Sequence, residues 1–356
     1  MSKINSIDLI RDLTNAFGAP GFEDDVVAVA RGYAPDSVNI VEDSMRNLYF
    51  YPKVGINPDL PTVLVDAHSD EVGLMVQAIK ENGTLTFMPL GMWSAPVLLA
   101  QKLIIKNRKG EFVYGVVASR PPHFGGNESD LKVTDMVIDI GATSKEEVLE
   151  SYHIGVGSPI VPFGEFHHNQ ATGIMMSKAF DCRLGCAAVI EVMEQVAGEK
   201  LGINVIGVLS AQEEVGMRGA KVAANVVKPH IAICFEGTPA DDTFAPPEMI
   251  QTALKKGPML RHIDPGMITH PRFIRLALDV AEKKGIPVQE SVRTGGFTNG
   301  SAYQMSGKGV PNIIIAHPSR HVHSPNSIAY LPDYKNGVKL AVEILRTLDK
   351  DIIDGF

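Results

Sequence analysis

The chain contains 356 residues, of which 33 are Lys or Arg and 41 are Asp or Glu, so its net charge is −8. A content of 45% hydrophobic and 21% charged residues is typical of globular proteins and excludes a disordered or fibrous chain. The acidic balance argues against nucleic-acid and membrane-surface binders, which usually carry a basic patch. Three cysteines do not build a disulfide framework, and the sequence shows neither a signal peptide nor a membrane span, so we expect a cytoplasmic protein.

The N-terminal segment and four later segments give the clearest structural signals. Apolar residues spaced three to four apart between Ile7 and Phe17 predict a helix, with Ser6 as the candidate N-cap. Short β-branched runs predict buried strands of a parallel sheet at residues 62–65, 205–210, 231–235 and 313–316. Helical patterns fill the intervening chain at 184–196, 272–284 and 334–348. This alternation predicts an α/β fold with a mixed, mostly parallel sheet flanked by helices.

Each of the four predicted strands leads into acidic or histidine side chains. They are His68 and Asp70 after the first strand, Glu213 and Glu214 after the second, Glu236 after the third, and His317 and His323 after the fourth. Ligands of such sheets bind outside the carboxyl ends of the parallel strands, so these side chains are expected to converge. One polar strand end is unremarkable, whereas four together predict a site.

The pattern changes between residues 73 and 164. Short alternating segments at 103–105, 112–117 and 136–140 are separated there by Gly, Pro and Asn. They predict a small β-rich domain inserted into the α/β chain. The main domain is then expected to comprise residues 1–72 and 165–356.

The polar residues at the strand ends, together with Asp181, have the composition of a metal site. Imidazoles and carboxylates suit Zn, Co or Mn, and a two-metal site needs a carboxylate that bridges the ions. Two divalent ions carry four positive charges, against three negative charges on Asp181, Glu214 and Glu236. The charges of such a centre would therefore nearly balance.

Two further acidic positions are expected to support this centre. Neighbouring side chains at a strand end point in different directions, so one of Glu213 and Glu214 can bind metal while the other acts as general base. Asp70 is expected to hydrogen-bond the second ring nitrogen of His68. Each residue alone has a simpler explanation, such as an exposed Glu pair or, for Asp181, a helix N-cap. Only their joint occurrence supports a metal site.

Several sequence motifs resemble those of the tetrahedral aminopeptidases, which are co-catalytic metallopeptidases that include glutamyl and deblocking aminopeptidases. These motifs are AHSDEVGLMV (67–76), AFDCRLGCAAVIEVM (179–193), SAQEEVGMRGA (210–220), FEGTPADD (235–242) and HPSRHVHSP (317–325). GVVASRPPHF (115–124) and VIDIGATSKEEV (137–148) resemble the inserted domain of that family. The motifs follow the family order and cover nearly the whole chain.

The resemblance implies a zinc-peptidase-like fold and two divalent metal ions per subunit, Zn or Co, with Mn as a further candidate. His68 and Glu236 would hold one ion, Glu214 and His323 the other, and Asp181 would bridge them. Glu213 would be the general base, with Asp70 supporting His68. The inserted domain would mediate dimer contacts, and the dimers would assemble into a dodecamer that acts on peptide substrates.

Three positions depart from the family pattern. Glu236 stands where many members have Asp, and Cys182 follows Asp181 where Asp or Asn is usual. Asn299 replaces an Asp, which would remove a negative charge near the expected site. The preference for the first substrate residue is not determined by the motifs, although Arg261, His262 or Arg293 would favour acidic residues if they faced the site.

Three alternatives to an aminopeptidase remain open. A related dinuclear amidohydrolase or deacylase would use the same residues on an N-acyl substrate. A metal-independent endoglucanase-type hydrolase would need two carboxyl groups that flank a sugar. A weakly active assembly protein would use the insertion to oligomerise around a vestigial site.

Overall fold

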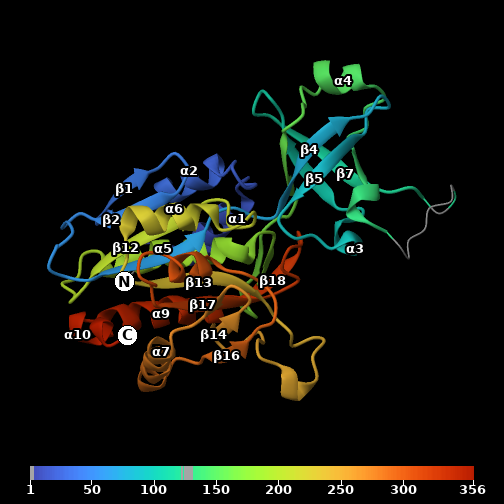
Figure 1. Ribbon diagram of the computed structural model, residues 1–356. Coiled ribbons are helices and arrows are strands. Elements are labelled where there is room, and N and C mark those ends of the chain that lie inside the picture. Colours follow the sequence, from blue (N-terminus) through green and yellow to red (C-terminus); the bar gives the residue numbers. More distant parts are fainter. Residues whose placement is uncertain (1–3, 122, 124–130) are drawn as a thin grey trace.

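The centre of the protein is a twelve-stranded mixed sheet (Figure 1). The computed structural model describes residues 4–121, 123 and 131–356. The main path of the sheet runs in the order β1 (Val38–Glu42), β2 (Leu48–Pro52), β12 (Asn204–Ser210), β3 (Thr62–His68), β13 (Ile231–Pro239), β17 (Asn312–Arg320), β18 (Ser327–Tyr330), β11 (Ile174–Ser177) and β10 (His167–Asn169). Three more strands join beside β17, namely β14 (Met259–Asp264), β15 (Met267–Ile268) and β16 (Gln289–Val292).

The four strands predicted from β-branched runs form the parallel centre of this sheet. β12 pairs with β3, β3 with β13, and β13 with β17, all in parallel. Antiparallel strands extend the sheet on both sides, to an extent that the sequence pattern did not indicate. The predicted α/β fold with a mixed sheet is confirmed, but the sheet is not mostly parallel, because most of its strand pairs are antiparallel. The parallel strands at its centre place the predicted polar residues at one edge.

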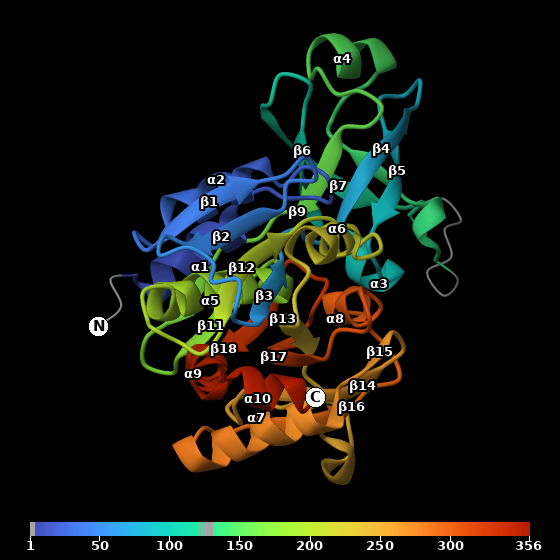
Figure 2. The same ribbon diagram turned by 60° about the vertical axis from the view of Figure 1, so that its left-hand side comes forward.

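Helices cover both faces of the sheet (Figure 2). One face carries α1 (Ser6–Asn15), α2 (Asp24–Gly32), α5 (Phe180–Val196), α7 (Pro271–Lys284), α9 (Leu331–Thr347) and α10 (Lys350–Asp354), and the other carries α6 (Arg218–Val227) and α8 (Asn299–Gln304). Successive side chains of β3 alternate between the two cores, with Val63 and Val65 in the first and Leu64 in the second. Across the described residues, every helix is too short or too polar to cross a lipid bilayer.

The first helix begins at its predicted cap, Ser6, so the actual cap lies one residue earlier. The Asn5 side chain, not that of Ser6, accepts the N–H of Ile7 at 3.0 Å, and Ser6 is already helical. Asn and Ser cap helices about equally well, so the composition of the segment did not distinguish the two positions.

Between β3 and β10 the chain forms a closed six-stranded antiparallel barrel. Its elements are β4 (Gly73–Ile79), β5 (Leu85–Leu90), α3 (Ala95–Leu98), β6 (Lys102–Lys106), β7 (Phe112–Ala118), η3 (Val133–Asp135), β8 (Val137–Asp139), α4 (Lys145–Glu150) and β9 (Pro159–Pro162). The barrel closes because β9 pairs with both β4 and β6, and it has a hydrophobic core of its own.

The barrel agrees with the β-rich insertion expected from the sequence (Figure 1). The barrel strands run from Gly73 to Pro162, whereas domain boundaries at 73 and 164 stay a prediction. Part of the motif at 115–124 lies outside the described residues, at positions 122 and 124. A short 3-10 helix, η4 (Pro247–Met249), lies outside the barrel in the connection from β13 to β14.

Candidate metal centre

The carboxyl ends of the parallel strands bring two histidines and four acidic residues to one cavity of about 360 Å³. The residues are His68 at the end of β3, Glu213 and Glu214 after β12, Glu236 in β13, His323 after β17, and Asp181 at the start of α5. Glycine at position 237 permits this arrangement, since a Cβ there would lie 2.6 Å from the Cβ of Asp181. The other histidine predicted at a strand end, His317, lies within β17 and packs between Phe235 and Tyr334 in the core.

His68, Asp181 and Glu236 form the first half of the centre. The Nε2 atom of His68 lies 3.0 Å from Oδ1 of Asp181 and 3.2 Å from Oε1 of Glu236. Burial raises the pKa of Glu236 to about 7. Burial disfavours charge on His68, but the neighbouring carboxylates outweigh it and raise the pKa of His68 well above its ordinary value.

His323, Asp181 and Glu214 form the second half. The Nε2 atom of His323 lies 3.3 Å from Oδ2 of Asp181 and 3.5 Å from Oε1 of Glu214. Burial raises the pKa of Glu214 to about 8. Burial also opposes ionisation of Asp181, but the two imidazoles outweigh it and hold the pKa of Asp181 below its ordinary range.

Both imidazoles are oriented in the same way. The Nδ1 atom of His68 lies 3.1 Å from the carbonyl oxygen of Asp70, and that of His323 lies 2.9 Å from the carbonyl oxygen of Met92. A carbonyl oxygen can only accept, so Nδ1 carries a proton in each ring and a neutral ring presents the Nε2 lone pair to the carboxylates. A lone pair facing carboxylate oxygens is unfavourable unless a proton or a cation lies between them. Histidine ligands of metals are commonly fixed by such a hydrogen bond.

Two overlapping groups of these residues have the spacing of metal sites. One contains His68, Asp181, Cys182 and Glu236, the other contains Asp181, Glu214 and His323, and within each group the ligand atoms lie within 4.8 Å of one another. Asp181 belongs to both groups and turns one oxygen toward each histidine. Within the described structure, the buried Oε1 of Glu214 also has no hydrogen-bond partner. The donor set therefore has the chemistry of a site for divalent metal ions.

Asp70 contacts this centre differently from the sequence expectation. Its carbonyl oxygen accepts the nearer hydrogen bond from His68, while its Oδ1 lies 3.5 Å from the same nitrogen. The carboxylate instead accepts the backbone N–H groups of Glu213, at 2.9 Å, and Glu214, at 3.1 Å. Asp70 thereby joins the ends of β3 and β12.

Asp181 does not have the predicted capping role. Its non-helical backbone angles would suit a capping residue, but its carboxylate is not directed at the backbone of α5. The Asp181 carboxylate instead points into the centre, where it contacts the imidazoles of His68 and His323.

Three buried charged residues that the strand-end pattern did not indicate hold the loop after β3. Glu71 lies 2.5 Å from the Lys178 ammonium and 3.2 Å from the Arg183 guanidinium, and all three side chains are buried. Burial lowers the pKa of Lys178 to about 8. Glu71 and Arg183 lie inside the motifs at 67–76 and 179–193, and this position in the motifs is the sequence signal that could have identified them.

Glu23 is a fourth buried charged residue that the sequence patterns did not indicate. Its Oε1 accepts the N–H groups of Gly21 at 2.8 Å and Gln212 at 3.1 Å. Burial raises the pKa of Glu23 to about 8. The carboxylate thus ties the N-terminal segment to the start of the loop that carries Glu213.

Asn299 lies beneath the centre and does not line the cavity. Its amide donates to Oδ2 of Asp66 at 2.7 Å and to the hydroxyl of Ser210 at 2.8 Å, and Asn299 and Asp66 are buried. Burial raises the pKa of Asp66 to about 6. Asn299 therefore serves as a neutral donor to a buried carboxylate two residues before His68, and its expected effect on the charge near the site stays a prediction.

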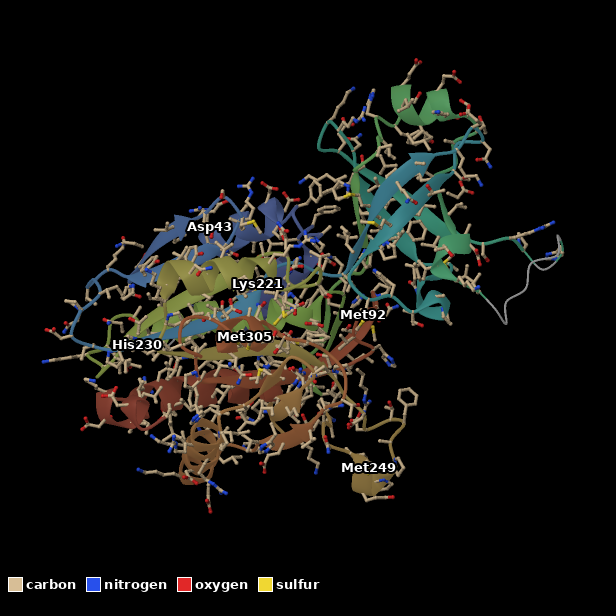
Figure 3. The ribbon with its side chains drawn as sticks, viewed as in Figure 1. Asp43, Met92, Lys221, His230, Met249 and Met305 are labelled. Atoms are coloured by element: carbon tan, nitrogen blue, oxygen red, sulfur yellow. The ribbon has the colours of Figure 1, made fainter. Side chains whose placement is uncertain are left out.

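The rest of the cavity combines apolar side chains with two arginines. Met92, Met217, Phe297 and Val322 line it, as do Arg261 and Arg293. Figure 3 shows Met92 at the junction between the barrel and the large sheet. His262 is directed elsewhere and pairs with Glu290 at 2.8 Å.

Relatives of known sequence share nearly the whole chain. A glutamyl aminopeptidase of Lactococcus lactis is 30% identical over 354 residues, which cover 97% of each chain. A lysyl aminopeptidase of Pyrococcus furiosus is 32% identical over 364 residues and covers 96% of this chain and 97% of its own.

Solved structures share the fold over the same length. A TET aminopeptidase of the archaeon Thaumarchaeota archaeon SCGC AB-539-E09 superposes with a TM-score of 0.92 at 36% identity, covering 98% of this chain and 99% of its own. The TET1 peptidase of Pyrococcus horikoshii, which can assemble into a tetrahedron or a large octahedral shell, gives a TM-score of 0.86 at 28% identity over 97% of this chain and all of its own. The sequence profile of the M42 glutamyl aminopeptidases matches residues 48–340. With the fold, the site and the relatives in agreement, the chain belongs to the M42 peptidase family.

Proposed function

We propose that this chain is a dinuclear metal-dependent aminopeptidase that removes N-terminal residues from peptides. The observation that carries the proposal is the position of Asp181, whose two oxygens face the Nε2 atoms of His68 and His323. Both imidazoles are held by backbone carbonyl groups, as metal-binding histidines commonly are.

The ligand roles follow from the two groups of residues. His68 and Glu236 would hold one ion, Glu214 and His323 the other, and Asp181 both. Zn or Co, with Mn as a third candidate, suits this mixture of imidazole and carboxylate donors. When bound, two such ions would polarise the scissile carbonyl group and activate the attacking water.

Glu213 is the general base in this proposal. It lines the cavity beside Glu214, and burial raises the pKa of Glu213 well above its ordinary value. A carboxylate with a raised pKa accepts a proton from the attacking water more readily and can then pass it to the leaving amine. Asp70 acts as a positioning residue because it holds the backbone of Glu213.

We further propose that the enzyme prefers acidic N-terminal residues. The relative from Lactococcus is named a glutamyl aminopeptidase and that from Pyrococcus a lysyl aminopeptidase. Similarity to relatives alone is therefore consistent with a preference for either acidic or basic N-terminal residues. Arg261 and Arg293 line the cavity, and in the described structure the buried Nε atom of each has no hydrogen-bond partner. Arg261 is paired with Asp264 at 3.1 Å and Arg293 with Asp241 at 3.4 Å, which leaves donors on both guanidinium groups available to a carboxylate. A lysine side chain would instead meet two cations.

The barrel is the proposed dimerisation domain, with boundaries at residues 73 and 164. Phe112, Tyr114 and Val116 on β7 are each about half exposed, at 50%, 52% and 45%. Alternate residues of a strand share one face, so these three form an apolar strip on the outside of the barrel. The similar structure PhTET1-12s is a dodecamer, and the TET1 peptidase of Pyrococcus horikoshii can assemble into a tetrahedron or a large octahedral shell. Both support the proposal that dimers of this chain assemble into a dodecamer.

A panel of chromogenic aminoacyl substrates tests the function. We expect the chelated protein to be inactive and the protein reconstituted with Zn or Co to hydrolyse glutamyl substrates faster than leucyl, alanyl or lysyl ones. Hydrolysis of a glucan that survives chelation would support the endoglucanase alternative. Metal-dependent cleavage of N-acyl amino acids without aminopeptidase activity would support a deacylase, and inactivity throughout would support an assembly protein.

A further inference from the structure

The two halves of the candidate centre differ by one sulfur atom. Cys182 directly follows Asp181, and its side chain is fully buried. Its Sγ belongs to the group that contains His68 and Glu236, in which all ligand atoms lie within 4.8 Å of one another. The group formed by Asp181, Glu214 and His323 contains only nitrogen and oxygen donors.

The position of the sulfur is set by its neighbours. Its thiol donates to the carbonyl oxygen of Phe235 at 3.4 Å, in the residue before Glu236. A Cβ at Gly185 would lie 2.4 Å from the sulfur, so the glycine one turn along α5 leaves the space that the sulfur occupies. The thiol therefore lies between the start of α5 and β13, the same two elements that supply Asp181 and Glu236.

We propose that Cys182 supplies a sulfur ligand to the ion held by His68 and Glu236, which makes that position softer than the one held by Glu214 and His323. The inference rests on the proposed dinuclear function. Binding of the ion displaces the thiol proton to solvent and forms a metal–sulfur bond.

The charge of the centre supports a fourth anionic donor. Asp181, Glu214 and Glu236 supply three negative charges against the four positive charges of two divalent ions. A thiolate at Cys182 brings the ligand charge to four, which balances the ions. A sulfur donor favours Zn, Co or Cd over Mn at that position, whereas the other position has no such preference.

Titration of the metal-free protein with Co²⁺ tests this under reducing, anaerobic conditions. Visible d–d bands report binding of the ion, and a near-ultraviolet sulfur-to-cobalt charge-transfer band reports a thiolate ligand. We expect both signals in the unaltered chain and loss of the charge-transfer band alone in Cys182→Ser. We also expect this variant to bind Zn about tenfold or more weakly at one of its two positions.

Cys186→Ser is the matched control. Cys186 is also buried, and its thiol donates to the carbonyl oxygen of His68 at 3.0 Å, but it belongs to neither ligand group. This variant and Cys234→Ser should keep the charge-transfer band. Cys182→Asn, which resembles the family motif, serves in place of the serine variant if that variant does not fold.

The outcomes separate this inference from the function on which it rests. Visible bands without a charge-transfer band in the unaltered chain, or a band that persists in Cys182→Ser, would overturn the sulfur ligand and leave the dinuclear centre standing. Absence of all cobalt bands would contradict the metal centre itself, and with it the inference.

Discussion

The carboxylate of Asp70 accepts the backbone N–H of Glu213 at 2.9 Å, although the two residues belong to different strand ends. The same carboxylate accepts the N–H of Glu214, while the Asp70 carbonyl group accepts a hydrogen bond from His68. Asp70 thus holds the proposed ligand His68 at the end of β3. It also holds the proposed base Glu213 and the proposed ligand Glu214, which follow β12.

Asp70→Asn should disturb the centre without unfolding the protein. The oxygen of the substituted amide can still accept one backbone N–H, from Glu213 or Glu214. The NH₂ group of this amide is a donor and cannot accept the other. We expect metal affinity or kcat to fall about 10- to 100-fold, with a loss of about 1–3 kcal/mol in unfolding free energy. Metal titration and steady-state kinetics measure the effect, and Asp59→Asn, at an exposed position, is the control. Unchanged affinity and kcat would show that the backbone contacts are dispensable.

Glu213→Gln should abolish most turnover while metal content stays at two ions per chain. The amide cannot accept a proton from water, so kcat is expected to fall by about 10²- to 10⁴-fold. Kinetics with a glutamyl substrate and elemental analysis of the same sample check both statements. Glu214→Gln provides the contrast, since loss of a ligand should lower metal content. A near wild-type rate in Glu213→Gln would assign the base to another residue.

Arg293→Gln should shift substrate preference. Hydrogen bonds to charged groups contribute about 1.5–3 kcal/mol, so kcat/KM for a glutamyl substrate should fall about 10- to 100-fold, with little change for a leucyl substrate. His262→Gln is the control, because the sequence also made His262 a candidate for recognising acidic residues but the structure places it outside the cavity. Equal losses on both substrates would indicate a structural role for Arg293.

Stability of the metal-free protein should fall as pH rises from about 4.5 to 9. Burial raises the pKa of Glu214 to about 8 and that of Glu236 to about 7, so the folded chain keeps protons that the unfolded chain releases near pH 4.5. Burial opposes charge on His323, but Asp181 and Glu214 outweigh it and raise the pKa of His323 to about 9. Its stabilising contribution is therefore full below pH 6.5 and is lost as pH rises through about 9.

Zn should reverse this trend, since ligands must lose their protons to bind it. The difference in melting temperature between Zn-loaded and metal-free protein should therefore be larger at pH 8 than at pH 5.5. Zn at one hundred times its Kd adds about 2.7 kcal/mol. Thermal unfolding at both pH values measures the difference, and an equal difference at both would contradict ligation by these groups.

Asn299→Asp should destabilise the protein in a pH-dependent way. The change places a second carboxylate beside the buried Asp66, whose Oδ2 now accepts from the Asn299 amide at 2.7 Å. Because burial already raises the pKa of Asp66 to about 6, the pair must retain a proton, and the cost grows as pH rises. We expect a loss of about 3–5 kcal/mol at pH 7.5 and a smaller loss at pH 5. Unfolding measurements should show no such loss for Asn225→Asp on the exposed face of α6.

The parallel centre of the sheet could be predicted because its strands are short β-branched runs whose ends meet at one edge. That rule predicted that the side chains at the strand ends converge, and the structure places four of them in one cavity, namely His68, Glu214, Glu236 and His323. The backbone contacts of Asp70 could not be predicted, since they depend on how the loop after β12 folds back toward β3. Likewise, Glu71 and Arg183 are charged residues that look exposed in the sequence, and only the packed structure shows that they are buried together.

Closure of the barrel was also beyond the sequence pattern. Alternation indicated separate strands, but β4 closes on β9, which lies at the other end of the insertion. Such pairing depends on register between distant segments, which local patterns do not encode.

The position of Asp181 between His68 and His323 has a consequence for synthesis of the chain. The two histidines come from opposite ends of the sequence, and the second follows β17, so the nascent polypeptide cannot assemble the centre until its last sheet strands have left the ribosome. The proposed site is therefore completed only after about nine-tenths of the chain has been made, because His323 is the last of its ligands in the sequence of 356 residues.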